Sequence, residues 1–294
     1  MSQINKLISN KTVRPLYKNY TAIIGLNPSQ GARSPVLWNS AFKGYKIKNQ
    51  MIPLDVNSKK LFKLLTALEK DQNFIGGCVT IPHKERVFEW LKRRLTNSSR
   101  KVGAVNCIFR DQAGNLQGTN TDGEAALESF KKKFGRINNK KIVLIGAGGA
   151  GKAVSSYFIA EMLKKSNLTI VGRSKLSEKF SKKIGSKWIN FKNISKIDLK
   201  EFDTVINCSS IGFNKNKNKS PLLFRQLKNA SKKLSVFDII YNPKITKLIS
   251  DSIKNNLKVL NGLDMNLRQA VLAFGYTNKK LKKSKKTLEY MLSV

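Results

Sequence analysis

The feature that most constrains the fold is a glycine-rich turn between an apolar run and an amphipathic stretch. Residues 142–145 read Ile-Val-Leu-Ile, and the residues after them read Gly-Ala-Gly-Gly-Ala-Gly-Lys-Ala. A strand, turn and helix of this kind place Gly146 in the tight turn and Gly148 where backbone can approach a pyrophosphate. The usual third glycine is displaced, so Gly151 or Ala153 is expected to give close helix packing. The predicted dinucleotide contacts are Gly146, Gly148, Gly149 and Ala150. The alternative interpretation is that these residues form only a simple tight turn.

The residues after the next apolar run indicate which dinucleotide binds. Residues 168–171 are followed by Gly172, Arg173, Ser174 and Lys175. Sites specific for NAD carry Asp or Glu at the end of this strand to hold the ribose 2′-hydroxyl. A carboxylate would repel a 2′-phosphate, whereas a guanidinium grips it with paired hydrogen bonds. NADP is therefore the predicted cofactor, with Arg173 and Ser174 as contacts; the alternative is that Arg173 and Lys175 are ordinary surface cations.

The spacing of the apolar runs indicates two α/β domains, and a chain of 294 residues is long enough for each domain to bury its own core. From Tyr20 onwards, short apolar runs alternate with amphipathic stretches, and a hairpin-like turn follows at 111–114. A polar stretch at 135–141 precedes a second alternation, typical of a doubly wound parallel sheet. The predicted ranges are an α/β domain over 1–130, the dinucleotide-binding domain over 131–260, and C-terminal helices over 261–294.

The net charge of +38, from 56 Lys+Arg against 18 Asp+Glu, raises the question of a nucleic-acid or membrane partner. The cations are spread through the whole chain, as a drifting residue composition would produce on solvated faces. Their densest clusters lack interleaved aromatic residues that could stack on bases. We therefore expect no specific nucleic-acid partner, although the charge would attract anionic ligands at low salt. These clusters are at 131–133, 140–141 and 279–286.

The cysteine and histidine content argues against a metal centre and a disulfide scaffold. Cys78, Cys107 and Cys208 are far apart and form no C-x-x-C pair, which suits reduced thiols. The only histidine is His83, so no zinc ligand set is expected. The apolar runs are shorter than the roughly 18–20 residues that cross a bilayer, and the charged start at 1–20 does not resemble a signal peptide. A cytoplasmic protein without a membrane partner is predicted.

Two segments of the first domain carry candidates for proton transfer. Residues 79–85 end a strand and begin a helix, which places Lys84 in the first turn, where the helix dipole favours release of its proton. Thr121 and Glu124 fit a capping box, which makes Asp122 the first helical residue and stabilises its carboxylate. In a chain this rich in lysine, Lys84 taken alone would more often be a solvated surface residue. By spacing alone, Asp122 could equally be a helix-capping residue and nothing more.

These segments belong to a set of motifs that resembles the shikimate dehydrogenases over nearly the whole chain. Seven motifs occur in the family's order. They are Asn27-Pro28 with Ser34-Pro35, Val79-Thr80-Ile81-Pro82-His83-Lys84, Ala104-Val105-Asn106, Asn120-Thr121-Asp122-Gly123, Gly146-Ala147-Gly148-Gly149-Ala150, Tyr241-Asn242-Pro243 and Asn261-Gly262-Leu263.

The resemblance implies an NADP-dependent oxidoreductase that reduces 3-dehydroshikimate to shikimate in the chorismate pathway of aromatic amino acid biosynthesis. It implies that the first domain binds the substrate and that the C-terminal helices return to it. A catalytic pair of Lys84 and Asp122 is also implied. The implied substrate contacts are Ser34, Thr80, Asn106, Asp122, Tyr241 and Gln269, and Gly262 is an implied cofactor contact. Either a monomer or a homodimer is compatible with this prediction.

Three departures from the family pattern leave the substrate open. The family's Ser-x-Ser-Pro reads Ala32-Arg33-Ser34-Pro35, so one hydroxyl for the substrate carboxylate is missing unless Arg33 or Ser29 compensates. The family's Asn-Val-Thr begins here with Cys78, and its Gly-Leu-Gly-Met carries Asp264. One alternative is therefore a dehydrogenase of quinate or another cyclic hydroxy acid; the other is an inactive basic homologue that acts as a binding protein.

Overall fold

The computed structural model describes residues 1–11, 14–281 and 285–294, so part of the basic run at 279–286 lies outside the described residues. Its contacts group the chain into two compact units, Met1–Thr121 with Leu267–Val294, and Asp122–Asn266. The first boundary, after Thr121, comes earlier than the predicted boundary at 130/131. The second boundary, after Asn266, comes later than the predicted boundary at 260/261. The reason lies in helix α6 (Asp122–Phe134), which packs against α7 (Gly149–Glu161) of the second unit.

The first unit contains a five-stranded mixed sheet in the order β2-β1-β3-β4-β5. Strands β1, β2 and β3 pair in parallel, whereas β4 pairs antiparallel with both β3 and β5. The predicted turn at 111–114 joins β4 to β5, and Gly114 there has a φ of +84°, a conformation that glycine adopts without strain. The strands are β1 (Tyr20–Gly25), β2 (Met51–Asp55), β3 (Phe74–Val79), β4 (Cys107–Arg110) and β5 (Leu116–Thr119).

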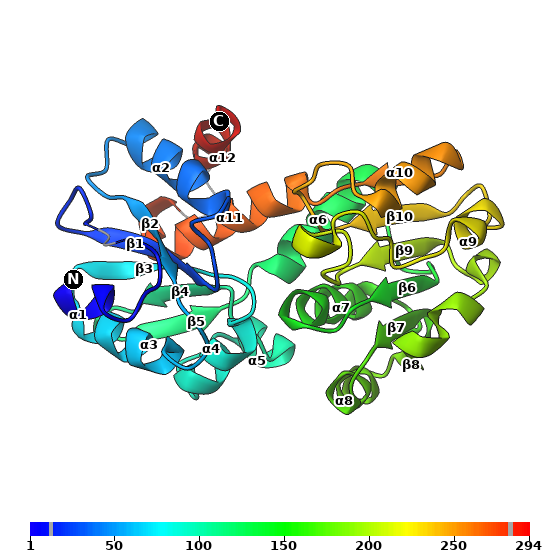
Figure 1. Ribbon diagram of the computed structural model, residues 1–294, viewed down its shortest axis with the longest axis horizontal. Helices are drawn as coiled ribbons and strands as arrows, with labels where there is room; N and C mark the ends of the chain where they lie inside the picture. The colour runs from blue at the N-terminus through cyan, green and yellow to red at the C-terminus, as the bar shows by residue number, and fades with distance from the viewer. Residues whose placement is uncertain (12–13, 282–284) are drawn as a thin grey trace. The chain divides into compact units, whose positions relative to one another are not determined.

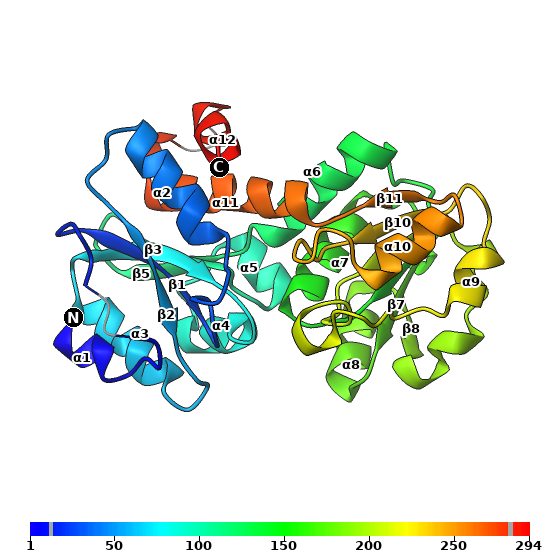
Figure 2. The ribbon, with the colours of Figure 1, turned by 45° about the horizontal axis from the view of Figure 1, so that its top comes forward.

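Helices cover both faces of this sheet, which explains why β1 is buried along its whole length (Figures 1 and 2). Ala22 and Ile24 face a cluster built with α1, α3 and α4. Ile23 points the other way, into a cluster built with α2, α11 and α12, since side chains alternate along a strand. The helices are α1 (Ser2–Asn5), α2 (Ser34–Gly44), α3 (Leu61–Lys70), α4 (Lys84–Leu91), α5 (Asn97–Val102), α11 (Leu263–Thr277) and α12 (Lys285–Leu292).

The second unit is the predicted doubly wound parallel sheet, with the order β11-β10-β9-β6-β7-β8. Chain order reverses between β6 and β9, and ligands of such sheets bind beyond the carboxyl ends of the strands at that reversal. The strands are β6 (Ile142–Ile145), β7 (Leu168–Gly172), β8 (Lys187–Asn190), β9 (Thr204–Asn207), β10 (Ser235–Asp238) and β11 (Lys258–Leu260). The remaining helices are α8 (Lys175–Ile184), α9 (Phe224–Lys228) and α10 (Lys247–Lys254), with 3-10 turns at Lys165–Asn167, Phe191–Lys196, Leu199–Glu201, Asn214–Asn216 and Lys279–Leu281.

Helix α2 begins at Ser34, with Pro35 as its second residue. Helix α4 begins at Lys84, and Pro82 lies in the preceding turn after a cis peptide bond. Among the described helices, none combines the length and apolar character needed to cross a bilayer.

Candidate active site

The turn after β6 has the geometry expected of a dinucleotide-binding segment. Gly146 has a φ of +100°, and a Cβ there would lie 2.8 Å from the backbone nitrogen of Ser209. Gly151 packs against the turn, since its Cβ would lie 1.9 Å from the Gly146 carbonyl oxygen. A Cβ on Gly148, by contrast, would meet no described atom within 4 Å. Gly151 therefore packs closely against the turn, and the space beside Gly148 leaves room for a pyrophosphate.

The start of α7 suits an anion because its N-cap residue, Gly148, has no side chain to satisfy the first backbone N–H groups. Gly149 and Ala150 are the first two residues of this helix. Their N–H groups lie at the positive end of the helix dipole, which favours a phosphate. Both residues therefore fit the role predicted for them.

The end of β7 carries no carboxylate and has no space for one. A Cβ on Gly172 would lie 2.3 Å from Ser177 Oγ and 3.2 Å from Trp188 Nε1. Arg173 is exposed, whereas Ser174 caps α8 by accepting a hydrogen bond from the Ser177 N–H at 3.2 Å. The structure thus gives Ser174 a helix-capping role, and the contact of Arg173 with a 2′-phosphate stays a prediction.

A buried polar network follows β9 and β10 at the same edge of this sheet. Asn207 Nδ2 donates to Asp238 Oδ1 at 3.1 Å and to the Ile211 carbonyl at 3.0 Å. Asp238 also accepts bonds from Thr246 Oγ1 at 2.7 Å and from the Ile240 N–H at 3.1 Å. Burial raises the pKa of Asp238 to about 6, although these hydrogen bonds act in the opposite direction. The network fixes the turns that follow both strands.

In the first unit, three residues from distant parts of the sequence meet: Asn106, Thr121 and Gln269. The Thr121 N–H donates to Asn106 Oδ1 at 2.8 Å, and Asn106 Nδ2 donates to Thr121 Oγ1 at 2.9 Å. Thr121 Oγ1 donates to the Gln269 carbonyl at 3.2 Å, and Asn106 Nδ2 lies 3.4 Å from Gln269 Oε1. All three residues are buried.

This cluster brings together two predicted substrate contacts and adds one residue that the sequence analysis missed. Thr121 was interpreted there only as a helix cap, yet its hydroxyl and N–H join Asn106 to Gln269. Its place inside the Asn120-Thr121-Asp122 motif was the signal that could have identified it.

Lys84 is half-buried at the first position of α4. Its carbonyl accepts a bond from the Val105 N–H at 2.9 Å, and Val105 directly precedes Asn106. Thr80 lies in the turn between β3 and α4, where its carbonyl accepts a bond from the His83 N–H at 3.0 Å. Neighbouring backbone segments of the first unit therefore carry Thr80, Lys84 and Asn106.

His83, the residue before Lys84, is fully buried and neutral. Its Nε2 lies 2.7 Å from the Val56 carbonyl oxygen, to which it donates, and burial lowers its pKa. This bond attaches the start of α4 to the segment after β2. His83 thus has a structural explanation for its position.

Ser29, one of the two residues named as a replacement for the missing hydroxyl at Ala32, is hydrogen-bonded within the first unit. Ser29 Oγ donates to Asp55 Oδ2 at 2.5 Å, and the Ser29 N–H donates to Asp55 Oδ1 at 2.9 Å. The hydroxyl proton of Ser29 is therefore used within the protein. Arg33 is the N-cap residue of α2 and directly precedes the buried Ser34.

Gly262 and Asp264 have intramolecular roles in the second unit. A Cβ on Gly262 would lie 1.9 Å from the Ile239 carbonyl oxygen, so packing alone requires a glycine there. Asp264 accepts a hydrogen bond from Ser129 Oγ at 2.7 Å and lies 3.5 Å from the ammonium of Lys132. Its carboxylate therefore joins the start of α11 to α6.

The predicted catalytic and substrate-binding residues divide between the two units. Ser34, Thr80, Lys84, Asn106 and Gln269 belong to the first. Asp122, buried at the first position of α6 as predicted, and the half-buried Tyr241 belong to the second. The pairing of Lys84 with Asp122 stays a prediction.

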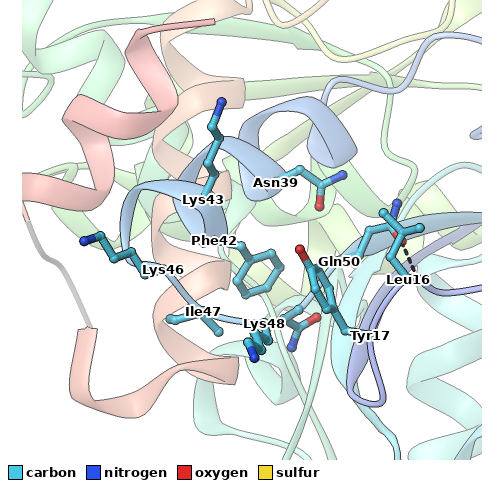
Figure 3. A pocket seen from close by; sticks show the side chains of 10 residues that line it. Leu16, Tyr17, Asn39, Phe42, Lys43, Lys46, Ile47, Lys48 and Gln50 are labelled. Atoms are coloured by element: carbon cyan, nitrogen blue, oxygen red, sulfur yellow. Dashed lines mark hydrogen bonds between the residues drawn. The ribbon is translucent and has the colours of Figure 1, made fainter.

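A pocket of about 470 Å³ in the first unit contains none of the predicted site residues (Figure 3). Asn39 and Gln50, two of its polar lining residues, already bond to the protein: the Met51 N–H donates to Asn39 Oδ1 at 2.7 Å, and the Leu16 N–H donates to Gln50 Oε1 at 3.0 Å. Its basic lining side chains are Lys43, Lys46 and Lys48. In a chain this rich in lysine they do not by themselves indicate a ligand.

Comparison with known families gives two matches. A model described as the shikimate dehydrogenase substrate binding domain matches residues 23–108. A second, described as shikimate / quinate 5-dehydrogenase, matches residues 128–263. Together they cover more than half of the chain.

Individual relatives agree with these matches. The chain is 34% identical over 262 residues to the shikimate dehydrogenase (NADP(+)) of Methanococcus maripaludis strain C7. The aligned region covers 86% of this chain and 90% of that protein. The protein of the same name from Methanococcus vannielii is 31% identical over 266 residues, with the same coverage. A crystal structure of a shikimate dehydrogenase in complex with NADP+ superposes with a TM-score of 0.80 at 26% identity, covering 98% of this chain and 97% of that one.

Proposed function

Because this chain belongs to the shikimate dehydrogenase family, we propose that it reduces 3-dehydroshikimate to shikimate with NADPH. Two features that occur together in this chain support the proposal. The second unit has a dinucleotide turn followed by a strand that ends in Gly172-Arg173 without a carboxylate. The first unit gathers Asn106, Thr121 and Gln269 in one hydrogen-bonded cluster.

NADPH, when bound, supplies the hydride for the ring ketone. Lys84 then donates a proton to the oxygen of that ketone as negative charge develops on it. Asp122, in its ionised form, holds and orients the ammonium of Lys84. We infer this pair from the family motif, from the position of Lys84 at the start of α4, and from the position of Asp122 at the start of α6.

We propose that the ring hydroxyls of the substrate are held by Thr80, Asn106, Asp122 and Gln269, with Tyr241 near the ring. Thr121 is a positioning residue for this set, because its hydroxyl and N–H orient the amide of Asn106. The carboxylate of the substrate is expected at Ser34. Arg33 is the neighbouring residue that could compensate for the hydroxyl missing at position 32.

On the cofactor side, Gly148, Gly149 and Ala150 would hold the pyrophosphate, and Arg173 would hold the 2′-phosphate. We place Gly146 and Gly262 in this site as glycines that the backbone requires, and Ser174 as the cap that orients the segment after Arg173. The protein is proposed to act in the cytoplasm, in the aromatic amino acid pathway, as a monomer or a homodimer.

Quinate is the second candidate substrate, because the segment expected to bind the substrate carboxylate departs from the family pattern at Ala32. A hydrogen bond to a charged group contributes about 1.5–3 kcal/mol, so its absence would weaken shikimate binding tenfold or more unless Arg33 compensates. The Ser29 hydroxyl, committed to Asp55, offers no proton for this purpose.

Steady-state assays of the purified protein with shikimate and quinate, each with NADP and NAD, test the proposal. We expect the highest kcat/KM for shikimate with NADP. Turnover of quinate without turnover of shikimate would establish the second candidate. Absence of turnover in all four combinations, together with salt-sensitive retention of nucleic acid, would indicate a basic binding protein instead.

A further inference from the structure

We propose that Cys78 and Cys107 form a reversible disulfide bond and are thus a site of oxidative modification in the first unit. Cys78 lies near the end of β3, and Cys107 is the first residue of β4. The two residues are directly opposed in the antiparallel pairing of these strands. Opposed residues point to the same face of a sheet, and both cysteines contribute to the cluster beneath α2 and α11.

The hydrogen-bond pattern places this pair at a geometry that a disulfide can span. The Val79 N–H donates to the Asn106 carbonyl at 2.8 Å, so the next opposed pair along the strands is hydrogen-bonded. Hydrogen-bonded and non-hydrogen-bonded pairs alternate, which makes Cys78 and Cys107 a non-hydrogen-bonded pair with Cα atoms about 4.5 Å apart. Disulfides join Cα atoms separated by roughly 4.4–6.8 Å. The backbone is therefore already within bonding range.

The environment of the two thiols decides which oxidant can reach them. Cys78 is 4% exposed and Cys107 is 0% exposed, and Cys107 Sγ lies 3.7 Å from the Ala273 carbonyl of α11. Burial raises the pKa of the Cys107 thiol, so that side chain is the poorer first nucleophile. A hydrogen-peroxide-sized oxidant fits this site better than a bulky disulfide reagent.

The reaction balances with peroxide as the only oxidant. The Cys78 thiolate attacks one peroxide oxygen, the O–O bond breaks, and a sulfenic acid and one water result. The Cys107 sulfur then attacks the sulfenic sulfur, the S–O bond breaks, the S–S bond forms, and a second water leaves with the Cys107 proton. Two sulfurs are oxidised by two electrons in total, and one peroxide is reduced.

A disulfide between Cys78 and Cys107 would shift the residues beside it. Directly opposed Cβ atoms lie about 4.5–5.5 Å apart, and a disulfide brings them to roughly 3.5–4.5 Å. Thr80 follows Cys78 by two residues and Asn106 precedes Cys107, so closure shifts the two strand ends that carry them. A displacement of about 1 Å in a catalytic site can lower turnover by up to ~10²-fold. This consequence rests on the function proposed above, whereas the bond itself does not.

The test for the bond is peptide mapping after oxidation of the full chain. The purified, reduced protein is treated with hydrogen peroxide, quenched with catalase, denatured, alkylated and digested. We expect a Cys78–Cys107 cross-linked peptide that disappears after dithiothreitol. The Cys208→Ala variant should give the same cross-link, whereas Cys78→Ala and Cys107→Ala should not. Recovery of Cys107 in the alkylated form beside a Cys78 sulfinic acid, or of all three cysteines alkylated, would overturn the proposal.

Turnover measured on the same samples tests the consequence separately. We expect at least a tenfold loss of kcat after peroxide, restored by dithiothreitol, in the wild type and in Cys208→Ala. The Cys78→Ala variant should show no loss that dithiothreitol reverses. A cross-link with unchanged kcat would disprove the effect on turnover, and a protein that is inactive when fully reduced would instead contradict the proposed function.

Discussion

At the residue scale, Lys84 and Asp122 carry the prediction on which the chemistry depends. Replacement of Lys84 with Ala should lower kcat by about 10²–10⁴-fold, the range for a positioned acid–base group, while NADPH binding measured by fluorescence stays near normal. Lys84→Arg should not restore the rate, because a guanidinium does not release its proton near neutral pH. The exposed Lys63 of α3 offers a matched control, since Lys63→Ala should leave kcat unchanged.

Asp122→Asn should lower both kcat and substrate affinity, since it removes the charge that holds the ammonium and weakens an acceptor for a ring hydroxyl. The double variant should be little worse than the poorer single one, as expected of groups that act as a unit. Near-normal kcat in Lys84→Ala would make Lys84 an ordinary surface lysine.

Arg173 carries the prediction on cofactor choice. Arg173→Ala should raise the KM for NADP far more than the KM for NAD, because only NADP has the 2′-phosphate. Lys175→Ala, two residues along the same exposed segment, is the comparison that separates a specific contact from a general loss of charge. Equal effects of Arg173→Ala on both cofactors would show that Arg173 does not discriminate between them.

The raised pKa of Asp238 predicts how the free energy of unfolding depends on pH. Its pKa is raised to about 6 from the usual 3.8, so the folded state binds the proton more tightly than the unfolded state does. The stabilisation from the neutral carboxyl is present at low pH and is lost as pH rises through about 6. The total loss in the free energy of unfolding is about 3 kcal/mol. Urea unfolding from about pH 4 to 7 should show the free energy of unfolding of the wild type falling relative to Asp238→Asn. A difference that stays constant with pH would contradict this.

Among the elements, the turn between β6 and α7 holds Gly151, which packing requires, close to Gly148, for which we propose a role in cofactor binding. Gly151→Ala would push a methyl group into the Gly146 carbonyl, so it should lower the free energy of unfolding by about 1–3 kcal/mol or more. Gly148→Ala meets open space and has a φ of −76°, so its stability should be near that of the wild type. Its Kd for NADPH should nevertheless rise, because the methyl group occupies the approach to the pyrophosphate. Titration calorimetry and thermal unfolding of both variants measure the two effects, and equal NADPH affinity for Gly148→Ala and wild type would exclude that approach.

At the scale of the whole molecule, the charge of +38 should act on both stability and binding. Self-repulsion opposes the compact state, and salt screens it, so Tm should rise as sodium chloride increases from about 0.01 to 0.5 M. The affinity for NADPH should fall over the same range, since the same field attracts the anionic cofactor. Sucrose at equal osmolality is the control, because it does not screen charge. A salt-independent Kd would show that the excess charge lies too far from the cofactor to matter.

Much of the element order could be predicted because it depends on residues that are close in the chain. The apolar runs at 142–145 and 168–171 lie in β6 and β7. Strand β8, Lys187–Asn190, was missed because it lies at the edge of its sheet, where its residues are exposed or half-buried and form no apolar run. The boundary after Thr121 was also missed, since it depends on the packing of α6 against α7.

The dinucleotide turn, the lack of a carboxylate at Gly172 and the position of Lys84 at a helix start could be predicted, because each is a property of neighbouring residues. Three contacts could be found only in the folded chain: Thr121 joins Asn106 to Gln269, Asp55 accepts a hydrogen bond from the Ser29 hydroxyl, and Cys78 lies opposite Cys107. These contacts join residues that lie far apart in sequence. Strand register and helix packing determine them, and both depend on which elements lie beside one another in the folded chain.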